Sequence, residues 1–91
     1  MELTIRQLLK FYSKYREGRR KLRKLFDIAK NENDINDIDF WLLTYTYAED
    51  RMVENTCAKL GMSKSTYHNH MNVALAKIEN TVKRYNQIWT F

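Results

Sequence analysis

A single glycine, Gly61, divides the most regular apolar pattern in this sequence into two parts. Between residues 51 and 78, apolar or small side chains recur at close to helical spacing, as expected for one side of a helix. They are Thr56, Leu60, Met62, Tyr67, Met71, Ala74 and Ile78. Glycine readily adopts the left-handed conformation in which many helices end. The stretch therefore predicts a helix, a tight turn and a second helix, the arrangement called helix-turn-helix.

The rest of the chain also favours helices. The 91 residues include no proline and only two glycines, Gly18 and Gly61, which argues for helices with few breaks and against a turn-rich β fold. A chain of this length is enough for one domain with a small core. We therefore expect a single all-α domain over residues 1–91, with four to five helices and a helix-turn-helix.

The N-terminal half is expected to hold two helical regions joined by a polar linker. Residues 4–30 have helical apolar spacing, with Thr4 as the N-cap and Gly18 as a bend or break between two helices. Residues 31–37, NENDIND, predict the linker, and Asn36 or Asp37 the next N-cap. Residues 38–48 are the most apolar stretch. Their alternating Tyr and Thr also permit a strand, but we expect a helix because no partner strand is predicted.

The helix-turn-helix is expected to begin with a short helix over residues 52–60, which Gly61 ends. A long helix follows from its N-cap, Ser63, to about Tyr85. Residues 86–91 form a tail that contains Trp89 and Phe91. These aromatic side chains either fold back onto the core or contact a second subunit.

Charge is unevenly distributed along the chain. Residues 1–30 carry ten Lys or Arg and three acidic side chains, whereas residues 31–50 carry six acidic side chains and no Lys or Arg. Two basic helical regions around an acidic connector suggest a polyanionic partner. Arg19, Arg20 and Arg23 are then candidate DNA phosphate contacts; the alternative is that this cluster is a solvated helix surface.

Several other functions find no support in the sequence. No apolar run approaches the roughly 20 residues that cross a bilayer, and no secretory signal is visible at the start. The single cysteine, Cys57, cannot form an internal disulfide, so we expect a cytoplasmic protein. We expect no membrane among its partners. His68 and His70 point in different directions on a helix, and with Cys57 they do not match the usual sequence spacing of metal ligands. We expect no metal, no cofactor and no enzymatic activity.

Residues 54–78, ENTCAKLGMSKSTYHNHMNVALAKI, resemble the C-terminal, region four-like helix-turn-helix of bacterial sigma factors, which binds the upstream promoter element. The matching positions are Leu60-Gly61-Met62-Ser63, Thr66-Tyr67, Met71, Ala74 and Lys77-Ile78. The resemblance covers roughly residues 36–85. It departs from the family at Thr56-Cys57, usually Ile-Ala, and at His68-Asn69-His70, often Lys, Ser and Arg. We expect none of the other sigma-factor domains within these 91 residues. The chain is more loosely similar to small phage or mobile-element transcription regulators of the late-gene activator type.

This interpretation assigns a role to each polar position of the second helix. Its outward side enters the major groove in a helix-turn-helix. The expected DNA base contacts are Lys64, Ser65, His68, Asn69 and Asn72. The expected further phosphate contacts are Ser63, Thr66 and Lys77.

We therefore expect a sequence-specific DNA-binding transcription regulator whose partner is double-stranded DNA. A homodimer is also expected, because a helix-turn-helix this small often needs two half-sites. Two alternatives stay open. In the first, the chain is a protein-interaction module that binds RNA polymerase or a repressor without its own DNA contact. In the second, the polar positions are ordinary helix surface.

Overall fold

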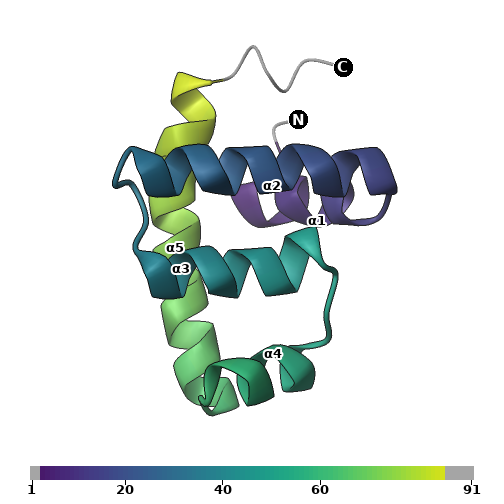
Figure 1. The fold of residues 1–91 in the computed structure, drawn as a ribbon, viewed down its shortest axis with the longest axis vertical. Helices are drawn as coiled ribbons and strands as arrows, with labels where there is room; N and C mark the ends of the chain where they lie inside the picture. Colours follow the sequence, from purple (N-terminus) through teal and green to yellow (C-terminus); the bar gives the residue numbers. More distant parts are fainter. Residues whose placement is uncertain (1–2, 86–91) are drawn as a thin grey trace.

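The computed structural model describes residues 3–85, and this part of the chain is helical apart from short connections (Figure 1). The elements are α1 (Ile5–Ser13), α2 (Arg16–Asn31), α3 (Asp37–Leu43), the π-helical turn η1 (Thr44–Ala48), α4 (Val53–Leu60) and α5 (Lys64–Arg84). No strand occurs within residues 3–85. The predicted all-α fold is confirmed, and residues 38–48 are helical as expected. The tail with Trp89 and Phe91 lies outside the described residues.

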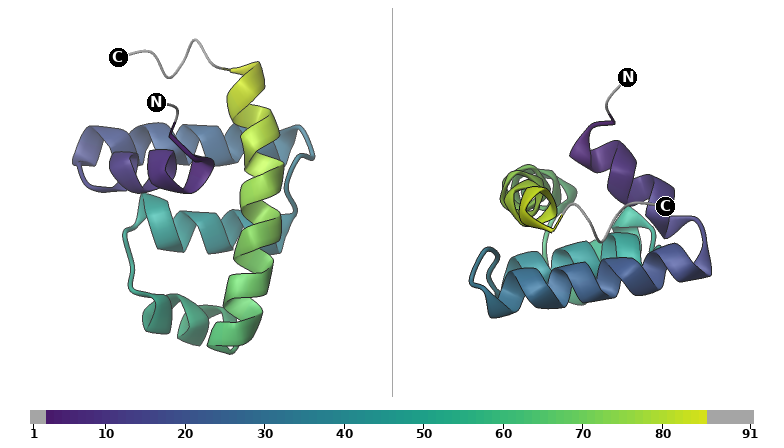
Figure 2. Two further views of the ribbon diagram at one scale, coloured as in Figure 1. Left: turned by 180° about the vertical axis from the view of Figure 1, so that it is seen from behind. Right: turned by 90° about the horizontal axis from the view of Figure 1, so that it is seen from above.

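The helices pack in two layers. α2 and α3 run side by side in opposite directions, and α1 and α5 lie behind them (Figures 1 and 2). α4 packs on the N-terminal end of α5, on the opposite side of α3 from α2 (Figure 1). The core lies between the layers, and its largest fully buried apolar side chains are Leu9, Tyr12, Leu22, Leu25, Phe26, Leu42, Leu43, Met71 and Ile78.

Side-chain caps set the helix starts where the sequence places them. Thr4 and Asn36 each form a capping box, with Gln7 and Asp39 respectively. Ser63 Oγ accepts a hydrogen bond of 3.2 Å from the Thr66 amide and begins α5. Gly61, at φ +64°, ends α4 in the left-handed conformation.

Gly18 permits a close contact rather than forming the helix break. The break between α1 and α2 lies at Lys14 and Tyr15, and Gly18 is buried in the first turn of α2. A Cβ atom at Gly18 would lie 2.1 Å from the carbonyl oxygen of Tyr12. Only glycine therefore lets the backbone of α1 approach α2 so closely.

The end of α3 widens into a π-helical turn. The Glu49 amide donates to the carbonyl oxygen of Thr44, five residues earlier, over 2.8 Å. Asp50 then takes a positive φ of 51° and directs the chain toward α4. This turn buries Tyr47 and Ala48, which places the following connection beside α1 and α5.

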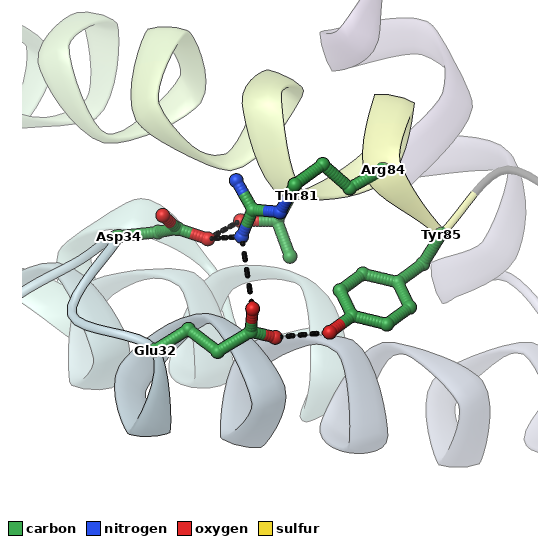
Figure 3. A network of polar contacts seen from close by, with 5 residues as sticks. All are labelled: Glu32, Asp34, Thr81, Arg84 and Tyr85. Atoms are coloured by element: carbon green, nitrogen blue, oxygen red, sulfur yellow. Dashed lines mark hydrogen bonds and ion pairs between the residues drawn. The ribbon is translucent and has the colours of Figure 1, made fainter.

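A polar network fixes the C-terminal end of α5 (Figure 3). Arg84 pairs with both Asp34 and Glu32, and the Tyr85 hydroxyl donates to Glu32. The fully buried Thr81 hydroxyl donates to Asp34 over 2.7 Å. These five residues, called the C-terminal network below, hold α5 against the α2–α3 connection.

No helix in the described part of the chain is both long enough and apolar enough to span a membrane.

Candidate nucleic-acid interface

The turn between α4 and α5 fixes which side of α5 faces outward. The Met62 amide donates to the carbonyl oxygen of Cys57 over 3.0 Å, which closes the turn beyond Gly61. Thr56 and Cys57 of α4 are buried, and the buried side chains of α5 include Tyr67, Met71, Ala74, Leu75 and Ile78. Tyr67 also shares a 3.1 Å hydrogen bond with Thr46, which ties α5 to η1.

Five polar side chains lie exposed along the outward side of the first three turns of α5. They are Lys64, Ser65, His68, Asn69 and Asn72, the residues expected to contact bases. We call this set the α5 polar face. It is one continuous surface because the buried residues of the same turns, Tyr67, Met71 and Ala74, lie outside the arc of the helix that these five residues cover.

Two members of the α5 polar face have partners on other helices. Lys64 forms an exposed 2.9 Å ion pair with Glu54 of α4, which raises the pKa of Lys64 and lowers that of Glu54. Asn72 Oδ1 accepts a 3.1 Å hydrogen bond from Arg6 of α1. An exposed pair contributes little to stability, so Lys64 can exchange Glu54 for another anion at low cost.

The expected phosphate contacts of α5 are engaged within the protein. Ser63 and Thr66 lie exposed at the helix start, where their hydroxyls share a 3.1 Å hydrogen bond. Lys77 forms a 2.9 Å ion pair with Asp39, whose side chain is only 3% exposed. Lys77 thus compensates a buried carboxylate and joins α5 to α3.

The basic cluster of α2 lies away from the α5 polar face. α2 and α4 are on opposite sides of α3, and α4 is next to the start of α5 (Figure 1). Arg19 donates to the carbonyl oxygen of Ser13 over 2.9 Å, and Arg20 lies 3.7 Å from Glu17. Arg23 is exposed beside Trp41. The structure therefore does not bring these three arginines together with the polar side chains of α5.

A cleft of about 290 Å³ instead brings other cations beside α5. Its lining includes Arg6 and Lys10 from α1, Arg51 from the η1–α4 connection and His68 from α5. We call it the basic cleft. Arg51 is partly neutralised, because its Nε lies 2.6 Å from Glu49. Burial raises the pKa of Tyr47, which also lines the cleft, so its hydroxyl stays protonated.

No local pattern in the sequence predicted the basic cleft. Arg6 and Asn72 are 66 positions apart, and only the packing of α1 against α5 brings them into contact. On the other side of α5, a second cleft includes Asn69, His70 and Val73 with Asn36 of α3. Val73 is 52% exposed and offers a methyl surface beside the polar face. His70 and Val73 were not among the expected contacts.

No group of three or more potential metal ligands from His, Cys, Asp and Glu occurs among residues 3–85.

Comparison with known proteins adds no relative to this description. No protein-family model matches the chain, and no curated protein or solved structure matches it. The resemblance to the sigma-factor helix-turn-helix therefore depends on the residues of α4 and α5 themselves.

Proposed function

We propose that this protein is a sequence-specific DNA-binding transcription regulator that places α5 in the major groove. The observation that carries the proposal is the α5 polar face, an exposed polar surface on the second helix of a helix-turn-helix. Its amide side chains, Asn69 and Asn72, suit bidentate bonds to adenine, and Lys64 suits guanine or phosphate. Ser65 and His68 lie in reach of neighbouring base edges.

The electrostatic attraction to DNA is assigned to the basic cleft. Lys64 is the only Lys or Arg of the α5 polar face, and it is paired with Glu54. Arg6 and Lys10 stand beside the same helix, where a DNA backbone passes when a helix lies in the groove. Arg6 also holds Asn72, so it links a base contact to the phosphate backbone.

The resemblance to sigma factors supports a promoter as the target and a phage or mobile element as the setting. A cytoplasmic location follows from that role. The residue-by-residue assignment of base contacts is part of the proposal.

Fluorescence polarisation on DNA selected from a random pool tests the proposal across a salt series. Arg6→Ala with Lys10→Ala should weaken binding about tenfold or more and lower the salt slope by roughly 2. Arg20→Ala with Lys24→Ala, two exposed side chains of α2, is the matched control and should change the affinity less than about twofold. Absence of binding at low salt contradicts the proposal. A larger loss from the α2 pair moves the phosphate contact to α2.

One observation favours a second function, a protein-interaction module that binds RNA polymerase or a repressor. The α5 polar face is weakly basic, and its single lysine is already paired. The polarisation salt series distinguishes the two functions, because the module would bind a protein partner and show no salt-dependent affinity for DNA.

A further inference from the structure

Two exposed apolar side chains of α3, Ile38 and Trp41, form a stripe that the half-buried Tyr45 of η1 continues. Ile38 is 51% and Trp41 is 42% exposed. The ring of Tyr45 stacks on that of Trp41 at 5.4 Å between centroids, one turn further along. Exposed Ile and Trp side chains at positions i and i+3 of one helix form an apolar ridge rather than scattered surface residues.

A hollow of about 160 Å³ lies directly beside this ridge, between α2 and α3. It is lined by Arg23, Asp27, Phe40, Trp41, Thr44 and Glu49. We call the ridge and the hollow together the Trp41 groove. A projecting indole next to a cavity is self-complementary, because a second copy of the same surface can insert its indole into the hollow of the first.

The charges at the groove are also self-complementary. Arg23 and Asp27 are one helical turn apart on α2, and neither has an ion-pair partner in the described part of the chain. Their neighbours are already paired, Lys30 with Asp37 at 3.4 Å and Arg51 with Glu49 at 2.6 Å. A partner with charges of one sign would be repelled by either Arg23 or Asp27. An antiparallel copy would instead place each Arg23 opposite Asp27 of the partner subunit.

We propose that the Trp41 groove is the interface through which two copies of this chain form a symmetric dimer. α2 and α3 of each copy pack antiparallel on their counterparts, and the two indoles lie near the two-fold axis. Each Trp41 enters the hollow of the other copy, and two reciprocal Arg23–Asp27 pairs border the contact. This dimer does not depend on DNA binding.

The dimer leaves both α5 polar faces accessible. α2 and α3 form one layer of the fold, and α1 and α5 form the other (Figure 2). Because the groove is exposed between α2 and α3, it lies on the outer side of their layer, away from α5. The two α5 helices consequently lie on opposite sides of the dimer, which suits two separate DNA segments better than adjacent half-sites of one segment.

Sedimentation equilibrium over a wide concentration range tests the interface. We expect the wild-type chain to associate to a dimer, and Trp41→Lys and Ile38→Lys each to weaken association about tenfold or more. Val73→Lys is the matched control, an exposed apolar side chain on α5, and should leave association unchanged. Circular dichroism checks that each variant folds. If Trp41→Lys does not fold, Ile38→Lys still tests the interface.

Two further measurements locate the contact. Arg23→Asp and Asp27→Arg should each weaken the dimer, and the double variant should restore it. In a Trp89→Phe background, Trp41 is the only tryptophan, and its emission should shift to shorter wavelength as concentration rises. A monomer at every concentration overturns the proposal, and so does a dimer that Ile38→Lys leaves intact. A dimer that Ile38→Lys leaves intact would place the contact on another surface. A monomer at every concentration would leave the groove to an unrelated partner.

Discussion

At its C-terminal end α5 is held by Glu32 and Asp34, whereas the polar side chains of its first three turns mostly face solvent. Both ends are rich in hydrogen-bonding groups. At one end, Thr81, Arg84 and Tyr85 are satisfied within the protein. At the other end, two of the five residues of the α5 polar face, Lys64 and Asn72, have side-chain partners on another helix. The same helix thus uses polar groups for folding at one end and leaves them available at the other.

The difference separates residues by what their loss should do. A polar group that already has a buried partner contributes to the free energy of unfolding, and an exposed group without one contributes little. Lys77 is the instructive intermediate. Its position on α5 suggests a DNA contact, but its partner Asp39 is buried. Variants that remove a buried contact should therefore lose more stability than variants of the α5 polar face.

Gly18→Ala should have the largest effect. The added methyl group would meet the backbone of Tyr12 at 2.1 Å, and backbone atoms cannot move aside cheaply. We expect a loss of about 3 kcal/mol in the free energy of unfolding, measured by urea denaturation. Gly61→Ala is the comparison at the other end of the molecule. No atom lies within 4 Å there, so only the positive φ opposes the substitution and the loss should be about 1–2 kcal/mol. Equal losses would contradict the steric explanation.

Lys77→Met should lower the free energy of unfolding by about 2 kcal/mol, because it leaves the buried Asp39 carboxylate without its cation. Adding Asp39→Asn should recover part of the loss. The control is Lys83→Met, whose ion pair with Glu79 is exposed and should change stability by less than about 0.5 kcal/mol. If Lys77→Met unfolds like the control and only weakens DNA binding, Lys77 belongs with the phosphate contacts instead.

Acid should weaken the C-terminal network. The hydrogen bond from Arg84, and then that from Thr81, hold the pKa of Asp34 below its ordinary value of about 3.9. A carboxyl group with a lowered folded-state pKa stabilises the fold above its unfolded pKa, and this stability is lost as pH falls through the folded pKa. Asp34→Asn should therefore cost about 1–2 kcal/mol at pH 7 and show a flatter acid profile of melting temperature. Glu17→Gln is the control, since its 3.7 Å ion pair with Arg20 is exposed, and it should change stability at pH 7 by less than about 0.5 kcal/mol.

Asn69→Ala should have the smallest effect on stability, within about 0.5 kcal/mol, because Asn69 is exposed on α5. On the proposed function, the same variant relaxes sequence preference at one base pair, by about 1–3 kcal/mol of discrimination. Selection of bound DNA from a random pool measures both binding and preference. A uniform loss of affinity across all DNA sequences would instead identify Asn69 as a contact to the DNA phosphate backbone.

Local patterns were enough to predict the helices and most of their ends. The Thr4, Asn36 and Ser63 caps and the left-handed Gly61 depend on neighbouring residues, and the structure confirms them. The π-helical turn was not predicted, because its apolar spacing resembles that of an ordinary helix. The role of Gly18 was also missed, since it depends on how α1 folds back over α2.

The candidate site shows the same division. The exposure of the α5 polar face follows from helical periodicity and was predictable. The positions of Arg6 and Lys10 beside it were not, because they depend on a contact between the first and last helices. For the same reason the sequence could not show that Lys77 faces Asp39, or that α3 separates Arg19, Arg20 and Arg23 from the start of α5.

The length of α5 has a mechanical consequence. Its 21 residues extend about 30 Å, close to the full 35 Å length of the molecule. The helix is fixed at three points along this length, because Tyr67 bonds to Thr46, Lys77 pairs with Asp39, and the C-terminal network holds its last turn. Disturbing Asp34 or Arg84 alone should therefore loosen the last turn of α5 and leave the α5 polar face in place.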